Sequence, residues 1–241
     1  MDTPAQAVTT ADPAFPTPSA ALRDAESSTL AEPKRRHGFL ARLLFTTLDL
    51  GYGRAGSLSK FAVLELVARV PYQAWENVGY TAISHTTANP KFGRRIFEFV
   101  REARAQQDNE QWHLFILEEL ASRERGKLSW FLFRAIPQLI AFVYYHLSWL
   151  LYVIKPRLSY SLNADFEDHA ERTYMQYVHD HPELEREPWH SNYASDYGRY
   201  ETVADVLRRI ALDERAHRLE CLARMEQPRF APESARDISV A

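Results

Sequence analysis

Two copies of Glu-x-x-His, Glu110–His113 and Glu214–His217, carry residue types that can hold a metal ion. Each copy lies in a stretch whose spacing predicts a helix, and residues three apart share one face of a helix. Each quartet can therefore direct a carboxylate and an imidazole at one point. Two such helices, with one Glu from each of two others, would form a carboxylate-bridged site for two metals. The candidates for the single glutamates are Glu65 and Glu167.

A third copy, Glu187–His190, shows why context matters, since so short a motif also occurs by chance. Pro188 disfavours helical backbone at Glu187, and the neighbouring Pro182 and Asn192 are typical of a loop. We therefore predict that this copy takes no part in a site.

Two assignments stay open on the residues alone. Glu65 lies in an apolar stretch, where a carboxylate needs a partner: either a metal ion or a cation such as Arg69. Glu171 follows Glu167 by one helical turn and competes with it as a ligand.

Four carboxylates and two imidazoles would make an oxygen-rich site, which suits iron or manganese. Four negative charges would also neutralise two divalent ions and so allow their burial. The quartet glutamates suit the bridging positions, and Glu65 and Glu167 the terminal ones. Each quartet histidine would bind one metal and needs a partner for its other ring nitrogen. Asn109 and Asp213, directly before the quartets, are the candidates for those partners.

The composition limits the class of protein. With a net charge of −3, the 241-residue chain gives no support for nucleic-acid binding. Its single cysteine excludes an internal disulfide framework and fits a reducing compartment. Only 8 Gly and no Gly-rich phosphate loop argue against a nucleotide-binding fold. Strand patterns with hairpin turns are absent, so the prediction is an all-α protein.

The ends of the chain differ from its middle. Residues 1–36 are rich in Ala, Pro, Thr and Ser and are predicted to be a disordered tail. Residues 227–241 are predicted to be a second, short tail, which leaves 37–226 as one helical domain. No apolar segment opens the chain as a secretory signal would, and the acidic residues near its start are atypical of a transit peptide. These features predict the cytoplasmic face of a bacterial inner membrane rather than an organelle.

The membrane assignment comes from two apolar segments. Helices are predicted over residues 38–50, 58–79, 91–122, 130–154, 160–180 and 201–226, with a loop over 181–198. Basic residues precede 38–50, which suits an anionic membrane surface, although a packed N-terminal helix is an equal alternative. The 130–154 segment is nearly long enough to span a bilayer. It also carries a polar stripe, which favours a helix lying in one leaflet with the stripe toward the protein over a membrane span: Arg134, Gln138, Tyr145, Ser148 and Tyr152. The many large aromatic side chains of the segment favour the membrane over a soluble core helix.

From about residue 58 to 222 the chain resembles the alternative oxidases, membrane-bound di-iron quinol oxidases, and especially their plastid-type branch. Four motifs carry the resemblance in the family's order. They are Leu64–Tyr72, Asn109–Leu114, Phe166–Ala170 followed by Thr173–Tyr174, and Asp213–His217.

The resemblance implies a ferritin-like four-helix bundle with a di-iron site, plus two membrane-surface helices near 38–50 and 130–154, assembled as a homodimer. It favours Glu167 over Glu171 as the ligand and implies that Tyr174 is redox-active. It also implies quinol-binding residues at Lys60, Leu64, His169, Ala170 and Thr173. Lys60 stands where the family usually has an Arg, which keeps the charge but loses the planar fork of donors.

The function that this resemblance implies is reduction of O2 to water by two iron ions without haem, with oxidation of two quinols to two quinones. Ubiquinol and plastoquinol are both possible donors. No haem ligation pattern is evident, so turnover is predicted to resist cyanide. The runner-up is a membrane-associated di-iron enzyme that hydroxylates a quinone ring. A soluble iron-handling bundle and a metal-free scaffold are weaker alternatives.

Overall fold

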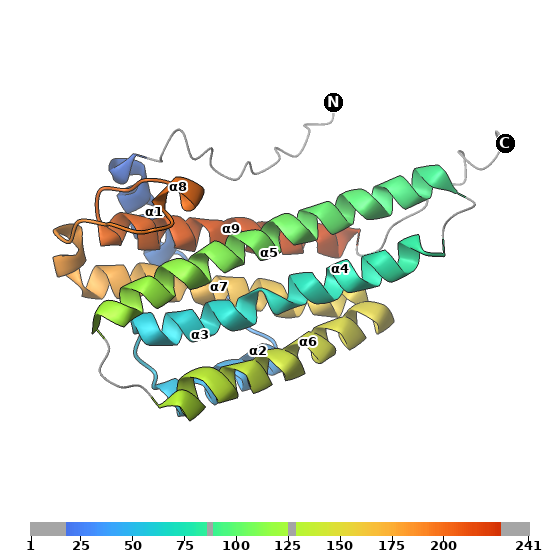
Figure 1. The fold of residues 1–241 in the computed structure, drawn as a ribbon, viewed down its shortest axis with the longest axis horizontal. Helices are drawn as coiled ribbons and strands as arrows, with labels where there is room; N and C mark the ends of the chain where they lie inside the picture. Colours follow the sequence, from blue (N-terminus) through green and yellow to red (C-terminus); the bar gives the residue numbers. More distant parts are fainter. Residues whose placement is uncertain (1–17, 86–88, 125–128, 228–241) are drawn as a thin grey trace.

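A computed structural model describes residues 18–85, 89–124 and 129–227 (Figure 1). The described part is helical, and its one β-type contact is an isolated bridge between Pro188 and Thr202. The all-α prediction is therefore confirmed. In chain order the elements are α1 (Ser19–Ala31), α2 (Phe39–Tyr52), α3 (Leu58–Ala68), α4 (Val70–Ile83), α5 (Pro90–Glu124), the π-helical turn η1 (Phe131–Ala135), α6 (Ile136–Ile154), α7 (Pro156–Asp180), the 3-10 turn η2 (Pro182–Glu185), α8 (Ala194–Tyr197) and α9 (Val203–Glu226).

The bundle consists of α5, α7, α9 and a fourth rod made of α3 and α4. α7 packs along α9, and α5 packs along both α3 and α4. Figure 1 shows these helices running side by side along the long axis, with α2 and α6 on one side. All four rods present an apolar face to one buried core.

The fourth rod was predicted as one helix over 58–79, but it breaks at Arg69. Pro71 has no N–H to donate to the carbonyl one turn earlier, and its ring crowds that turn. α3 therefore ends at Ala68, and α4 begins at Val70 and runs on to Ile83. The break lies one turn after Glu65, so both segments can reach the centre of the bundle.

Side-chain caps fix the starts of two helices that carry candidate ligands. Ser57 Oγ accepts the backbone N–H of Lys60 at 3.2 Å at the start of α3. Thr202 Oγ1 accepts the backbone N–H of Asp205 at 3.1 Å at the start of α9. These caps set where each helix begins, and with it which face each ligand occupies.

The prediction of a disordered tail over 1–36 is wrong for residues 19–31, which form α1 and pack on α7 and α9. The buried face of α1 is Leu22, Glu26 and Thr29. Two of these three residues are polar, so the segment lacks the apolar stripe by which a packed helix is recognised. Thr29 Oγ1 donates to Glu171 Oε1 at 2.9 Å in the interior. Residues 1–17, and 228–241 of the predicted C-terminal tail, lie outside the described residues.

A buried arginine holds α1 in place. Arg208 of α9 is 3% exposed, and its Nε donates to Glu26 Oε2 at 2.7 Å. The same guanidinium contacts Glu185 of η2 and Asp205 of α9. One cation therefore joins three acidic groups from three elements.

We expect Arg208→Ala to lower the free energy of unfolding by about 3 kcal/mol, because it leaves buried carboxylates without a cation. This corresponds to a fall of about 10 °C in the unfolding temperature, measurable by circular dichroism. Arg23→Ala is the matched control, since Arg23 is exposed and makes one 3.4 Å ion pair with Glu185. An equal effect of both substitutions would contradict the assigned role of Arg208.

α6 lies along the bundle with one face against α4, α7 and α3. Its buried face is Pro137, Ala141, Tyr144, Ser148 and Tyr152. The predicted stripe is thus right at Ser148 and Tyr152 and wrong at two other positions, because Arg134 and Gln138 are exposed. Pro137 and Ala141 occupy the contact near these positions, and their small or rigid side chains let α6 approach the neighbouring helices closely.

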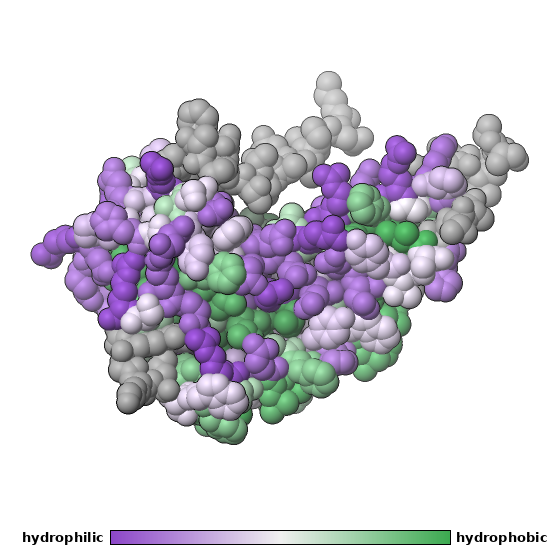
Figure 2. All heavy atoms as spheres, in the orientation of Figure 1, coloured by the Kyte–Doolittle hydropathy of each residue, from purple (hydrophilic) through white to green (hydrophobic). Residues whose placement is uncertain are grey.

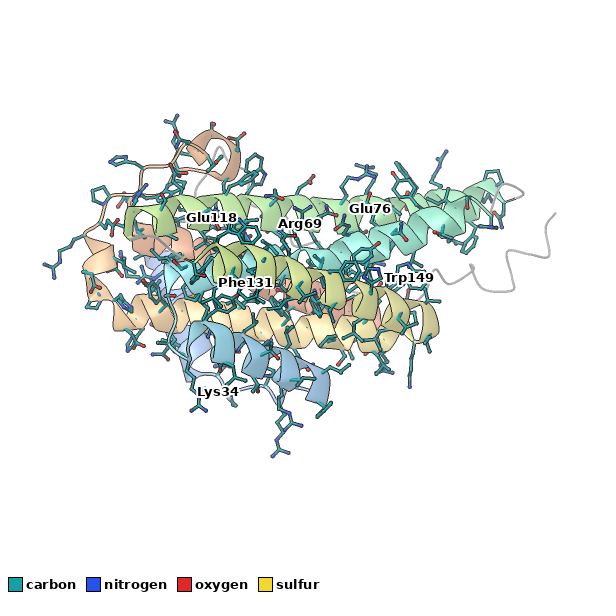
Figure 3. The ribbon with its side chains drawn as sticks, turned by 60° about the horizontal axis from the view of Figure 1, so that its bottom comes forward. Lys34, Arg69, Glu76, Glu118, Phe131 and Trp149 are labelled. Carbon is teal, nitrogen blue, oxygen red and sulfur yellow. The ribbon has the colours of Figure 1, made fainter. Side chains whose placement is uncertain are left out.

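The opposite face of α6 forms an exposed apolar surface with part of α2. We call it the α2–α6 face; its large exposed side chains include Phe39, Leu43, Leu50, Phe131, Leu139, Phe142, Val143, Trp149 and Ile154. Figure 2 shows apolar residues gathered along this edge, and Figure 3 brings it forward with Phe131 and Trp149 projecting from it. In the described part of the chain, Phe131–Ile154 is the segment long and apolar enough to cross a membrane.

Candidate metal centre

The six predicted ligands meet at the centre of the bundle, one set from each rod. Each is at most 5% exposed, and five of the six are at most 1% exposed. Their ligand atoms form two overlapping groups in which all atoms lie within 4.8 Å of one another. One group is Glu65, Glu110, His113 and Glu214; the other is Glu110, Glu167, Glu214 and His217. The two quartet glutamates belong to both groups, which is the arrangement that bridging ligands require.

The donor atoms that face the centre fit a pair of metal ions. Both carboxylate oxygens of Glu110 and Glu214, and Nδ1 of both quartet histidines, are buried without a hydrogen bond. His113 Nδ1 lies 3.0 Å from Glu214 Oε1, and His217 Nδ1 lies 2.7 Å from Glu110 Oε1. Each histidine therefore approaches the glutamate of the other quartet. Buried acids with free lone pairs are costly unless a cation neutralises them.

In each of the two terminal glutamates, one carboxylate oxygen accepts a hydrogen bond from the protein and the other does not. Glu65 Oε1 accepts a hydrogen bond from the Tyr174 hydroxyl, and Glu65 Oε2 has none. Glu167 Oε1 accepts from Tyr72 and from Asn163 Nδ2, both at 2.8 Å, and Glu167 Oε2 has none. One oxygen of each carboxylate thus remains available to a metal.

Tyr72 and Asn163 are site residues that the sequence reasoning missed. Asn163 precedes Glu167 by one turn of α7, a spacing that places both on one face. Its position was therefore a usable signal. Tyr72 comes from α4, and only the packing of α4 on α7 brings its hydroxyl to Glu167.

The other ring nitrogen of His113 faces one of the two candidate partners. His113 Nε2 lies 3.3 Å from Asp213 Oδ2. Asp213 also accepts from the Tyr197 hydroxyl at 2.6 Å and from Arg209. Asn109 makes no equivalent contact among the described residues, and its buried Oδ1 has no hydrogen bond.

The acids of the centre divide into two kinds. Burial, and next the charge of Glu214, raise the pKa of Glu65 and of Glu167 well above the usual range. For Glu110, burial is outweighed by contacts with His113 and His217, which hold its pKa below the usual range. Metal entry would therefore displace protons from the terminal glutamates.

We expect Asp213→Asn to weaken metal binding about 10- to 100-fold, because an amide no longer fixes His113 in one orientation. The pKa of Asp213 is about 2; burial is outweighed by the His113 contact and the charge of Arg209. The carboxylate is therefore charged at neutral pH. Iron titration of the purified variant measures the change, and an unchanged affinity would contradict this role.

The residues predicted to bind quinol fall into two sets. His169 and Thr173 line a cavity of about 420 Å³ between α7 and the segments that join α1 to α2 and α2 to α3. Lys60, Leu64 and Ala170 are at most 2% exposed and do not line it. Lys60 Nζ instead donates to Asp49 Oδ1 and to a backbone carbonyl, both at 2.7 Å.

The rejected quartet Glu187–His190 lies outside the helices. Trp189 N–H donates to the carbonyl of Glu201 at 3.2 Å, and His190 is exposed. The prediction that it lies in a loop is confirmed. Glu171, the competitor of Glu167, instead pairs with Arg215 and Arg218 at 2.9 and 3.0 Å.

Comparison with known proteins agrees with this centre. The alternative oxidase family matches residues 39–223, which include all six candidate ligands. A curated relative, chloroplastic/chromoplastic ubiquinol oxidase 4 of Arabidopsis thaliana, is 34% identical over 140 residues. That match covers 58% of this chain and 36% of the relative, so the chain spans little more than a third of that protein. The sequence match and the buried carboxylate–histidine cluster together show that this chain belongs to the alternative oxidase family.

Proposed function

We propose that the chain is a quinol oxidase in which two iron ions, without haem, reduce O2 to water. The observation that carries the proposal is the set of unpaired donor atoms at the centre of the bundle. Family membership supports it, as does the name of the relative. Two quinols would be oxidised to two quinones for each O2.

The protein's part in this chemistry is to hold the metals and to move protons and electrons. Bound iron would supply the redox chemistry with O2. Glu110 and Glu214 would bridge the two ions, while Glu65 and Glu167 would each bind one end through the free oxygen. The hydroxyl of Tyr174 is placed to give its proton to Glu65 Oε1 as the ring loses an electron.

The cavity beside His169 and Thr173 is our candidate for the quinol head group. Tyr177 lines this cavity, and its ring lies 5.0 Å from that of Phe61. Phe61 lies in turn 4.5 Å from Tyr174. Two packed rings therefore separate the cavity from Tyr174. The remaining proposed quinol-site residues, Lys60, Leu64 and Ala170, are buried and do not line this cavity.

A second cavity, about 310 Å³ and almost wholly apolar, lies between α2 and α6. Leu43 and Leu147 are among its lining residues. We propose that it admits the apolar tail of the quinol from one leaflet, in which the α2–α6 face lies. An exposed apolar surface built from so many large side chains is typical of a membrane or protein contact.

The homodimer implied by the family resemblance belongs to the same proposal, and the mass of the purified protein in detergent tests it. The cellular compartment is not part of the proposal. The relative is named as a chloroplast and chromoplast protein, which gives no support to the predicted cytoplasmic face of a bacterial inner membrane.

The deciding experiment is O2 uptake by the purified, iron-loaded protein with ubiquinol or plastoquinol, in the presence of cyanide. The proposal expects uptake with one or both donors and quinone as the organic product. An oxygenated quinone ring would assign the protein to ring hydroxylation instead. Near-zero iron after expression with ample iron would overturn the metal assignment.

We expect Leu139→Glu combined with Phe142→Glu to weaken binding to phospholipid vesicles at least about 100-fold. Each substitution removes about 1.5–3 kcal/mol of apolar burial and adds a charge. Phe97→Glu is the matched control, because Phe97 is 44% exposed on α5, away from the α2–α6 face. Sedimentation with vesicles measures both. Equal loss in the control would contradict this face as the membrane contact.

A further inference from the structure

Each terminal glutamate of the metal centre accepts a hydrogen bond from a tyrosine. Tyr174 donates to Glu65 at one end, and Tyr72 donates to Glu167 at the other. The ring of Tyr72 also lies 5.5 Å from that of His217, at 62° to it. Tyr72 therefore stands in the same relation to one end of the centre as Tyr174 does to the other.

The two tyrosines differ in the aromatic ring that packs against each of them. Behind Tyr174 lies Phe61, at a centroid distance of 4.5 Å. Behind Tyr72 lies Trp75, one turn along α4 at 5.2 Å, followed by Tyr160 at 4.7 Å. A benzene ring is much harder to oxidise than a phenol or an indole. Phe61 therefore resists stepwise electron transfer, whereas Trp75 and Tyr160 can continue it.

The row of oxidisable rings ends at α6. Tyr160 donates its hydroxyl hydrogen to the Tyr152 hydroxyl oxygen at 3.2 Å. Trp75, Tyr160 and Tyr152 are each at most 3% exposed. The Trp75 N–H donates to Ser159 Oγ at 2.8 Å. Such burial shields the indole from oxidants in solution, so selective oxidation of Trp75 would have to start inside the protein.

We propose that Tyr72 and Trp75 form an aromatic exit route, which draws oxidising equivalents away from the metal centre when no quinol is present. The inference rests on the proposed function, because its oxidant is the iron centre after reaction with O2. Tyr174 would serve the reaction with quinol, and Tyr72 would protect the ligands when that donor is lacking.

The steps balance as follows in electrons and protons. The Tyr72 phenol gives one electron to the oxidised iron centre and its proton to Glu167 Oε1, which leaves a neutral phenoxyl radical. The Trp75 indole then gives one electron to that radical, and Glu167 returns the proton. The net change is one-electron reduction of the iron centre and one-electron oxidation of the indole. Two such withdrawals, with addition of one water and loss of two protons, convert Trp75 to hydroxytryptophan.

The test uses full-length, iron-loaded protein that is repeatedly reduced with dithionite and re-oxidised with O2, without quinol. Mass spectrometry of its peptides should show one added oxygen atom on Trp75, and none in the metal-free protein. Tyr72→Phe should lower this modification to the metal-free level. Tyr80→Phe is the matched control on α4, since Tyr80 is 45% exposed and its hydroxyl contacts Arg104.

A second variant keeps the test decisive if Tyr72→Phe loses iron. Trp75→Phe retains Tyr72, and its tyrosyl radical, read by electron paramagnetic resonance after rapid freezing, should decay more slowly than the wild-type radical. Equal or faster decay would overturn the route.

Two results on the tryptophans would also overturn it. One is modification of the exposed Trp130 and Trp149 with none on Trp75; the other is equal Trp75 modification in wild type and an iron-loaded Tyr72→Phe variant. Quinol-driven O2 uptake by the wild type tests the proposed function separately. Uptake without Trp75 oxidation would overturn the exit route and leave the oxidase assignment standing.

Discussion

Replacing Glu110 or Glu214 with Gln is expected to abolish iron binding at both positions and to lower O2 reduction at least about 1,000-fold. Both residues belong to both groups of ligand atoms, and neither makes a hydrogen bond elsewhere that would hold it in place. A neutral amide can neither bridge two cations nor neutralise their charge. Loss of one bridge therefore removes both metals rather than one.

Two glutamates serve as matched controls for this loss. Glu187→Gln alters the quartet outside the helices and should leave iron content and activity unchanged. Glu171→Gln removes a partner of Arg215 and Arg218 and should lower thermal stability while retaining iron. Iron is counted by elemental analysis and activity by O2 uptake. Retention of two irons by Glu110→Gln, or their loss in Glu187→Gln, would refute the assignment.

The candidate ligand set could be predicted from sequence because helical spacing fixes which residues share a face. Within each quartet, spacing of three residues places Glu and His together without any knowledge of tertiary structure. For the single glutamates, spacing was insufficient, and the choice of Glu167 over Glu171 depended on the family motif. The structure gives the physical distinction: Glu171 has two arginine partners, whereas Glu167 Oε2 has none.

Features that depend on contacts between distant segments escaped the sequence reasoning. α1 is held by Arg208, more than 180 residues away, through ion pairs that leave no local pattern. Tyr72 becomes a site residue only when α4 packs beside α7. In the 130–154 segment, the prediction of which side faces the protein was wrong near Arg134, because the polar stripe was assumed to face the protein. The structure buries Pro137 and Ala141 there instead, because small apolar surfaces allow the helix to pack closely.

Removal of the metal is expected to lower the unfolding temperature by about 10 °C. A ligand present at about 1,000 times its dissociation constant stabilises the native state by about 4 kcal/mol, and each kcal/mol corresponds to about 2–4 °C for a chain of this length. The structural reason is the burial of four carboxylates within a few ångströms of one another. Thermal unfolding before and after chelation, and after return of iron, measures the effect.

In the metal-free protein, Glu167→Gln should raise the unfolding temperature relative to wild type. Glutamine Oε1 can still accept from Tyr72 and Asn163, while its amide can donate toward the bridging carboxylates without first taking up a proton. Burial and the charge of Glu214 raise the pKa of Glu167 in the metal-free protein. Folding at neutral pH therefore requires this carboxylate to take up a proton, which lowers the free energy of unfolding. We therefore expect the metal-free variant to unfold about 2–5 °C above metal-free wild type and to gain little from iron. A variant less stable than wild type in both states would show that Glu167 serves packing rather than metal binding.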